Sequence, residues 1–145
     1  MQEIISKALH IAETYDVSTN KDCAVVYSVS YMPNETNKIS AKEYVKANDK
    51  AKMLDDTPCG KALIDLGLDG KVNDVAEAIT KIWKIASSRY INSASGSITA
   101  FVDGADERST FCTTELNDIM QNPKITHINH IEKHIFFEKF HPQRY

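Results

Sequence analysis

The sequence predicts an α/β domain, with a mainly helical N-terminal part over residues 1–70 and a C-terminal, mostly parallel small sheet flanked by helices over residues 71–145. Two observations lead to this prediction. Apolar residues recur at helical spacing through the first half, whereas short β-branched segments alternate with helical ones in the second. Because the 145 residues contain no internal repeat and no low-complexity linker, we expect a single domain.

The N-terminal part begins with a predicted helix over residues 2–15. Its apolar residues have helical spacing: Ile4, Ile5, Ala8, Leu9, Ile11 and Ala12. Residues 23–29 are mostly apolar and β-branched, which indicates a strand or a buried extended segment. The turn-forming residues at 33–37 then predict a loop.

Two further helices are predicted before residue 70. Ser40 and Glu43 have the spacing of a capping box, which predicts a helix from Ser40 to about Leu54. The segment Asp55-Asp56-Thr57-Pro58 predicts the next helix start, because proline suits the first turn and acidic groups suit the N-terminal end of the dipole. We expect this helix to end at Gly67 or Gly70.

The sheet-containing part begins with the most regular helix of the sequence, which is predicted from Asn73 or Asp74 to about Ala94. Its continuous apolar stripe consists of Val75, Ile79, Ile82, Ala86 and Tyr90. Gly96 is the predicted stop signal after this helix. Residues 97–102 alternate as expected of a strand that ends before Asp103-Gly104.

The last predicted elements are a short helix and two strands. Thr113 or Thr114 is expected to cap the helix, which runs to Gln121 until Asn122-Pro123 ends it. Residues 125–128 and 134–137 are the predicted strands. This alternation of strand and helix favours parallel pairing.

The composition argues against several classes of protein. The net charge is −3 and no lysine or arginine cluster forms a stripe, so we expect no nucleic-acid partner. No apolar run approaches the roughly 20 residues that span a bilayer, and the first residues do not resemble a signal peptide, so we expect no membrane segment. Cys23, Cys59 and Cys112 are widely spaced and odd in number, which predicts neither a disulfide framework nor a zinc site.

Three features of the sequence can carry chemistry. Trp83, the single tryptophan, lies beside the apolar stripe of the long helix, with Ser87 one turn later on the same face. Thr110 belongs to a hydroxyl-rich helix start with Glu115 in its first turn, where backbone N–H groups can hold phosphate. The acidic segment Asp55-Asp56-Thr57 forms another helix start.

Together these features suit a nucleotide that carries a diphosphate and a flat ring. The ring would stack on Trp83, the diphosphate would meet Ser87 and Thr110, and a carboxylate would face the sugar. Cleavage of an N-glycosidic bond passes through an oxocarbenium-like state, which a nearby carboxylate stabilises. Each feature also has a structural interpretation, because a tryptophan on a helix is usually a core residue and acidic residues at helix starts are usually caps.

The stretch from Trp83 to Leu116 resembles the catalytic half of the ADP-ribosyl cyclase family. Residues 82–90 (IWKIASSRY) are similar to the family's helix Phe-Trp-x-x-(Ala/Val)-Ser-x-x-(Tyr/Phe). Residues 94–104 (ASGSITAFVDG) are similar to its Ala-x-Gly-x-Val strand with a terminal (Asp/Asn)-Gly. Residues 109–116 (STFCTTEL) match Ser-x-Phe-Gly-x-x-Glu-(Leu/Val), and residues 125–128 follow where the family has its next strand.

This resemblance implies an enzyme that cleaves NAD on an ADP-ribosyl cyclase-like fold. Glu115 corresponds to the catalytic glutamate, which grips the ribose and stabilises the charged intermediate. Trp83 corresponds to the tryptophan that positions nicotinamide, and Ser87, Thr110 and Phe111 correspond to contacts with the diphosphate. No metal and no cofactor are implied, because NAD is the substrate.

A second match lies upstream, where Leu54-Asp55-Asp56-Thr57-Pro58-Cys59-Gly60 is similar to the family's Leu-Glu-Asp-Thr-x-x-Gly, which binds the nicotinamide amide. Asp55 replaces a glutamate that influences the balance of cyclisation and hydrolysis, and Asp56 matches the next aspartate. The chain departs from the animal enzymes in its shorter length, its lack of a disulfide framework and its single tryptophan. Tyr31 and Tyr44 are the candidate replacements for the second active-site tryptophan.

We therefore expect an NAD glycohydrolase that releases nicotinamide and ADP-ribose, with cyclisation as a second product route. Such a compact domain suits a toxin module that acts in the cytoplasm, is delivered there as part of a larger secreted bacterial protein and is neutralised by an immunity protein. Two alternatives stay open: a ribonuclease toxin using His127 or His130 with Glu115, and a non-catalytic module that binds NAD or cyclic ADP-ribose. Because His127 and His130 fall on opposite faces of a strand–turn–strand unit, we expect no metal site there.

Overall fold

The computed structural model describes residues 2–28, 36–68, 76–107 and 109–142, and it contains a four-stranded sheet with helices on both faces. The strands lie in the order β1-β2-β3-β4, with bounds Ala24–Tyr27, Gly96–Phe101, Ile125–Ile128 and Ile131–Glu132. β1, β2 and β3 run parallel, and β4 returns antiparallel to β3. The predicted α/β class with a small, mostly parallel sheet is confirmed, although β1 comes from the first half of the chain.

The described helices differ widely in length. The α-helices are α1 (Gln2–Thr14), α2 (Thr36–Ala47), α3 (Pro58–Asp65), α4 (Ala76–Ser93), α5 (Leu116–Gln121) and α6 (Lys133–Lys139). The described residues also form two short helical turns: the 3-10 turn η1 (Leu54–Asp56) and the π-helical turn η3 (Phe111–Glu115), which continues directly into α5. No described helix is both long and apolar enough to cross a bilayer.

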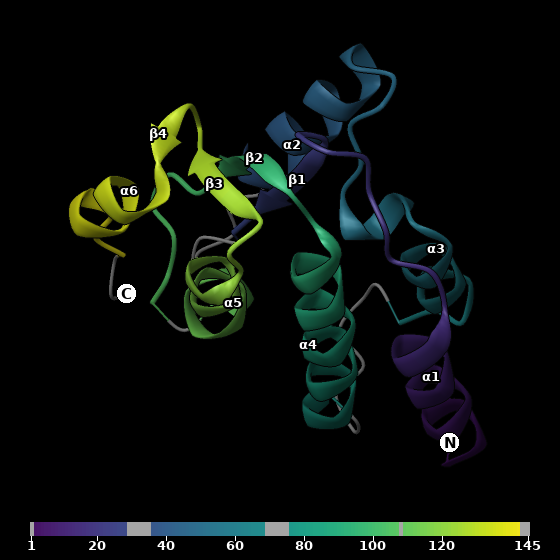
Figure 1. The fold of residues 1–145 in the computed structure, drawn as a ribbon. Coiled ribbons are helices and arrows are strands. Elements are labelled where there is room, and N and C mark those ends of the chain that lie inside the picture. The colour runs from purple at the N-terminus through teal and green to yellow at the C-terminus, as the bar shows by residue number, and fades with distance from the viewer. Residues whose placement is uncertain (1, 29–35, 69–75, 108, 143–145) are drawn as a thin grey trace.

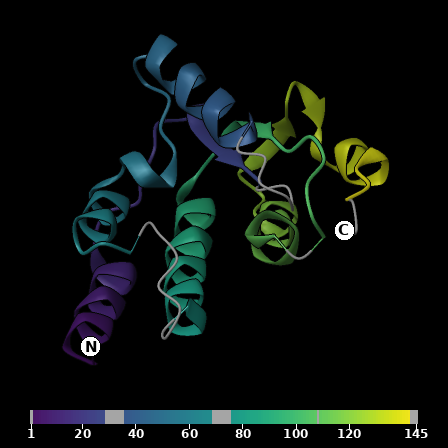
Figure 2. The ribbon, with the colours of Figure 1, turned by 180° about the vertical axis from the view of Figure 1, so that it is seen from behind.

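Two cores form on opposite faces of the sheet. Val25 points toward α2 and packs with Ala41 and Met53, whereas its neighbours Ala24 and Val26 join the main core with α4 and α5. This explains why β1 is apolar at consecutive positions, since a strand covered on both faces has no polar side. In both ribbon views α4 lies between α1 and α5 (Figures 1 and 2).

The long helix is joined to the sheet edge by Tyr90. Its buried hydroxyl accepts a hydrogen bond from the backbone N–H of Val25 at 2.9 Å and lies 2.5 Å from the carbonyl oxygen of Lys52. Ile79, Ile82, Ala86 and Tyr90 are buried, so the predicted stripe of α4 is confirmed within the described residues. The predicted start at Asn73 or Asp74 and the stripe residue Val75 lie outside them.

The predicted helix from Ser40 to Leu54 is wrong at both ends. α2 begins at Thr36, where the side chain of Asn37 donates hydrogen bonds to the carbonyl oxygens of Ser28 and Asp103 at the ends of β1 and β2. It ends at Ala47, because Lys52 pairs with the β1 edge. The predicted loop at residues 33–37 is wrong in its last two residues, which are helical, and residues 33–35 lie outside the described chain.

Two C-terminal predictions are also wrong. The predicted strand at 134–137 lies in α6, whose N-terminus is capped because the Glu132 carboxylate accepts from the His134 N–H at 2.5 Å. Neither Thr113 nor Thr114 caps the helix before Gln121, because helical structure already begins with η3. The predicted strands at 23–29, 97–102 and 125–128 and the predicted helix at 2–15 agree with β1, β2, β3 and α1 within a few residues, whereas β4 was not predicted. The helix after Asp55 starts at Pro58 with Thr57 as its cap, and its last residue is Asp65.

Candidate active site

A cavity of about 330 Å³ opens at the carboxyl end of β1, where ligands bind in many parallel sheets. β1 and the segment after it, α2, η1, α3, α4 and η3 all contribute to its wall. The wall is formed by Val25, Val26, Tyr27, Ser28, Lys38, Met53, Leu54, Asp55, Ile64, Leu68, Ile79, Thr80, Trp83, Ser87, Tyr90, Thr110, Phe111 and Glu115. The cavity therefore lies between the N-terminal helical part and the C-terminal part of the chain.

α4 brings an aromatic ring and a hydroxyl to this cavity. Trp83 and Ser87 lie one turn apart, so both side chains face the same side of the helix, as predicted. The indole Nε1–H of Trp83 donates to the carbonyl oxygen of Leu68 at 2.8 Å, which fixes the half-buried ring. Ser87 is buried and donates a hydrogen bond to the carboxylate of Glu115.

Glu115 is the last residue of η3, and the residue is buried, with 7% of its surface exposed. Burial raises the pKa of Glu115 from 4.5 to about 8, and the negative charges of Asp55 and Asp118 act in the same direction. The hydrogen bond from Ser87 opposes them, because it stabilises the ionised form. The Glu115 carboxyl group is therefore mostly protonated at neutral pH.

The turn that precedes Glu115 is held by serine hydroxyls. Ser109 Oγ accepts a hydrogen bond from Ser28 Oγ at 2.9 Å and another from the Cys112 N–H at 3.2 Å. These contacts tie η3 to the end of β1 and place Thr110 and Phe111 in the cavity wall. π-Helical turns are rare and often occur at functional sites, and here the turn carries the only buried glutamate of the described residues.

The acidic turn η1 enters the cavity from the opposite part of the chain. Asp55 lines the cavity, and burial raises its pKa, an effect that the ammonium of Lys38 partly opposes. Asp56 instead accepts from the Met53 N–H at 3.0 Å and lies outside this cavity. A Cβ atom on Gly60 would lie 2.0 Å from the Leu54 carbonyl oxygen, so the glycine of this motif allows α3 to pack against η1.

The cavity also contains residues that sequence reasoning did not single out. Lys38 supplies its positive charge, and Tyr27 and Ser28 supply an aromatic ring and a hydroxyl. The position of Tyr27 and Ser28 at the carboxyl end of a predicted strand is a signal that points to them. No local pattern points to Lys38, because its place depends on the hydrogen bonds of Asn37 to two distant carbonyl groups.

The structure brings together six of the seven predicted site residues: Asp55, Trp83, Ser87, Thr110, Phe111 and Glu115. The seventh, Asp56, caps the backbone beside them. Of the candidates for the second aromatic wall, Tyr44 packs against Phe101 on the α2 face of the sheet and is not part of the cavity. Tyr31 lies outside the described residues.

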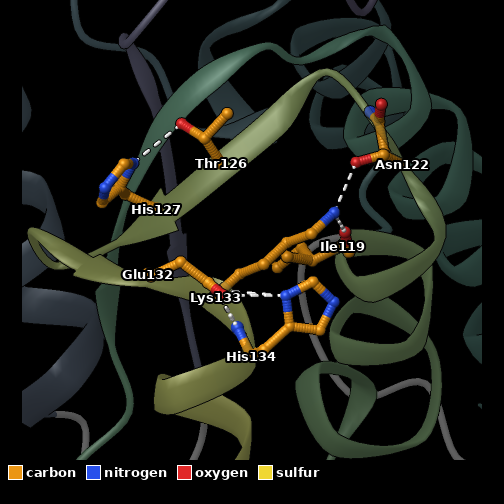
Figure 3. A network of polar contacts seen from close by, with 7 residues as sticks. All are labelled: Ile119, Asn122, Thr126, His127, Glu132, Lys133 and His134. Atoms are coloured by element: carbon orange, nitrogen blue, oxygen red, sulfur yellow. Dashed lines mark hydrogen bonds and ion pairs between the residues drawn. The ribbon is translucent and has the colours of Figure 1, made fainter.

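The candidate histidines His127 and His130, together with His134, lie away from this cavity, at the β3–β4 end of the sheet. His127 bonds Thr126, and His134 bonds Glu132 at 2.8 Å, both on the exposed surface (Figure 3). Glu115 is therefore not joined to His127 or His130, which removes the predicted combination for a ribonuclease. Among the described residues, no group of three or more His, Cys, Asp or Glu side chains is arranged to hold a metal ion.

This arrangement is suited to the chemistry of a cationic sugar. An aromatic ring, hydroxyl groups and a lysine can hold a nucleotide, and a buried carboxyl group can ionise when a positive charge forms beside it. An ionised carboxylate in such a site stabilises an oxocarbenium-like state far better than it would in water.

No protein-family model matches the sequence, and no curated protein matches it. The structure is similar to crystal structures of ADP-ribosyl cyclase complexed with N1-cIDPR (TM-score 0.58, 18% identity) and of Aplysia cyclase complexed with substrate NGD and product cGDPR (0.58, 18%). It is also similar to porcine CD38 complexed with a covalent intermediate, ribo-F-ribose-5′-phosphate (0.56, 21%). These matches cover 87% of this chain but only 62% of the two cyclases and 67% of CD38. The likeness establishes that the chain has the ADP-ribosyl cyclase-like fold.

Proposed function

We propose that this chain hydrolyses the bond between nicotinamide and ribose in NAD, giving nicotinamide and ADP-ribose. The observation that carries the proposal is the buried carboxyl group of Glu115, which shares a cavity with Trp83 and accepts a hydrogen bond from Ser87. The resemblance of residues 82–116 to the ADP-ribosyl cyclase family supports the same reaction, and so does the fold shared with ADP-ribosyl cyclase and CD38.

Glu115 acts in its ionised form. The nicotinamide ring of NAD carries a positive charge, and this charge beside Glu115 lowers the carboxyl pKa from about 8, so that binding of NAD favours loss of the proton. The carboxylate then stabilises the ribosyl cation as the glycosidic bond breaks and its electron pair leaves with neutral nicotinamide. A water oxygen bonds to the anomeric carbon and releases a proton, which completes ADP-ribose.

The remaining cavity residues bind the substrate. Trp83 offers its ring face to nicotinamide, and Asp55 lies where a carboxylate or carboxyl group can bond the carboxamide. Thr110 and the backbone of η3 face the diphosphate, and the ammonium of Lys38 supplies a matching charge. Ser87, which the resemblance assigns to the diphosphate, already bonds Glu115 and so also orients the catalytic carboxylate.

Hydrolysis is the proposed main route and cyclisation the minor one. Cyclisation needs the adenine to fold back toward the ribosyl cation, which an aromatic wall opposite Trp83 would promote. The chain has no second tryptophan. Besides Trp83, the aromatic residues in the cavity wall are Tyr27, Tyr90 and Phe111. Water therefore captures the intermediate more often than adenine does.

Binding of NAD without any turnover would instead indicate a non-catalytic binding module.

The biological role that we propose is depletion of NAD in a target cytoplasm, as a toxin module delivered within a larger secreted bacterial protein and neutralised by an immunity protein. The free cysteines Cys23, Cys59 and Cys112 support activity in a reducing compartment. Production of the chain in bacteria should lower the cellular NAD pool, and the Glu115→Gln variant should not. An unchanged NAD pool with the active chain present would refute this role.

The decisive experiment measures NAD loss by the purified protein and by Glu115→Gln, with chromatographic analysis of products. Glu138→Gln, at an exposed position on α6, is the matched control. We expect ADP-ribose and nicotinamide from the wild type and the control, and a loss of at least about 100-fold in the Glu115 variant. Quenching of the single tryptophan, Trp83, should show that the variant still binds NAD. Equal turnover by Glu115→Gln would refute the mechanism.

A further inference from the structure

Asn122 joins the ends of the two helical segments that carry the cavity residues. Its buried side-chain Nδ2 donates to the carbonyl oxygens of Ile91 at 3.0 Å and Ala94 at 3.1 Å, at the C-terminal end of α4. Its Oδ1 accepts from the Lys124 N–H at 2.9 Å. Because Asn122 itself follows the last residue of α5, these bonds tie the end of α5 to the end of α4.

A buried lysine holds the other side of Asn122. Lys133 Nζ donates to the Asn122 carbonyl oxygen at 2.8 Å and lies 3.4 Å from the carbonyl oxygen of Ile119 (Figure 3). Lys133 as a whole is only 7% exposed, and its charge lies at the negative end of the α5 dipole. Lys133 thereby holds the last turn of α5 in the position from which Asn122 reaches α4.

These contacts form one end of a frame whose other end is the site. α4 carries Ser87 about one turn before Ile91, and η3 with α5 carries Glu115 about two turns, or roughly 10 Å, before Asn122. The bond from Ser87 to Glu115 therefore crosses between the same two helical segments that Asn122 joins. A shift of either segment at the Asn122 end changes the distance between Ser87 and Glu115, because helices move as nearly rigid units.

We propose that Asn122 is a positioning residue for Glu115, and that Lys133 keeps Asn122 in place. The two side chains set the spacing of α4 and η3–α5 so that the Glu115 carboxylate meets the Ser87 hydroxyl. The effect on turnover rests on the proposed NAD cleavage, whereas the effect on the Ser87–Glu115 bond does not. A misplacement of about 1 Å at a catalytic group can cost on the order of 100-fold in rate.

The first test compares Asn122→Ala with Asn129→Gly. Asn129 also uses its side chain for two backbone hydrogen bonds, to the N–H and carbonyl of Ala100 at 2.8 Å each, and Gly accommodates its φ of 52°. Asn129 touches neither α4 nor η3–α5 in these bonds, so Asn129→Gly reports the cost of lost stability alone. We expect kcat for NAD to fall roughly 10-fold or more in Asn122→Ala with KM within about twofold, and both constants to stay near wild type in Asn129→Gly.

The second test is a double-mutant cycle with Ser87→Ala, read from the pKa of the Glu115 carboxyl group by NMR titration of the free protein. Two carboxylates face Glu115, those of Asp55 on η1 and Asp118 on α5. The ammonium of Lys38 lies in the same cavity wall. None of these three residues is substituted in any variant of the cycle. Loss of the Ser87 bond should raise the pKa of Glu115 in the wild-type background. The rise should be at most half as large in the Asn122→Ala background, where the bond is already weakened.

The outcomes are distinguishable. Equal rises in both backgrounds, or equal kcat losses in Asn122→Ala and Asn129→Gly, would overturn the positioning role and assign Asn122 to stability alone. A wild type that never consumes NAD would refute the proposed function, while the titration cycle would still decide the role of Asn122. If Asn122→Ala does not yield folded protein, Lys133→Met, which removes the ammonium and keeps the length of the side chain, carries the same expectation in both tests.

Discussion

Ser87 on α4 donates a hydrogen bond to Glu115 at the end of the π-helical turn, and this bond opposes the burial of the carboxyl group. Burial and the charges of Asp55 and Asp118 favour the neutral form, so the pKa of Glu115 reaches about 8 despite the bond. The balance leaves the carboxyl group close to ionisation at neutral pH. A charge that arrives with the substrate can then change its protonation state.

Ser87→Ala should lower NAD cleavage at pH 7 by roughly 10-fold. Without the hydroxyl the ionised form of Glu115 is less stable, so its pKa rises further above about 8. Below that pKa, each further unit lowers the ionised fraction about 10-fold. The measurement is kcat/KM from pH 6 to 9.5, with Ser88→Ala as the matched control on the same helix. A profile of Ser87→Ala that coincides with the wild type would contradict the role of this bond.

Asp55→Asn should move the same profile in the opposite direction. We expect kcat/KM of the wild type to rise with pH and to level off above about pH 8, because Glu115 must be ionised. Removal of the negative charge of Asp55 lowers the pKa of Glu115, so the rising limb shifts by roughly half a unit to lower pH. Asp65→Asn, on the exposed side of α3, should leave the limb in place. A shift of the Asp55 variant to higher pH would show that Asp55 does not act by charge.

Glu115→Gln should stabilise the protein at alkaline pH. The pKa of Glu115 is about 8 in the folded protein, above its ordinary value of 4.5. The protonated group therefore makes its full contribution to the free energy of unfolding below about pH 4.5, and this contribution is lost as the pH rises to 8. The uncharged glutamine does not ionise, so the variant escapes this loss of roughly 2 to 5 kcal/mol. Urea unfolding at pH 5, 7 and 8.5 measures it. The advantage of the variant over the wild type must grow with pH, and a constant difference would contradict the raised pKa.

The site residues on α4 could be predicted because their information is local. The stripe that ends in Ala86 and Tyr90 fixes which side of the helix is buried, and Trp83 and Ser87 follow from the helical period at the edge of that stripe. The cap at Thr57, whose hydroxyl accepts from the Gly60 N–H at 3.1 Å, is local in the same sense. Patterns of this kind depend on residues within one or two turns, which a single sequence contains.

The wrong start of α2 concerns a position that a distant residue decides, whereas the wrong strand at 134–137 is decided by a nearby cap that the strand-forming residues do not reveal. Ser40 and Glu43 have capping spacing, but the start of α2 is set by Asn37, which bonds carbonyl groups at the ends of two strands. The segment after His134 has strand-forming residues, yet Glu132 caps a helix there and Phe136 packs against Phe140. Local propensity is a weak prior when tertiary contacts compete with it.

The cavity as a whole could not be derived from spacing. Asp55 and Glu115 meet because η1 and η3 pack against α4, and nothing in the sequence between them encodes that approach. The resemblance to a known family brought both residues together in the prediction, whereas Lys38 has no such motif and was missed. The π-helical turn was missed too, because one extra residue in a helical turn has no sequence signature.

Gly60→Ala should displace η1 and weaken both the fold and the site. A Cβ atom there would meet backbone atoms, the Leu54 carbonyl oxygen at 2.0 Å and the Asp55 Cα at 2.8 Å, and neither can rotate away as a flexible side chain would. We expect a loss of roughly 2 to 4 kcal/mol in unfolding free energy and at least a threefold rise in KM for NAD, because Asp55 moves with η1. Gly67→Ala is the matched control: its φ of 81° strains an alanine, but no atom lies within 4 Å of the added Cβ, so stability should fall by about 1 kcal/mol with KM unchanged. A Gly60 variant as stable and as active as the wild type would show that α3 and η1 can separate without cost, and that the glycine of this motif serves no packing role.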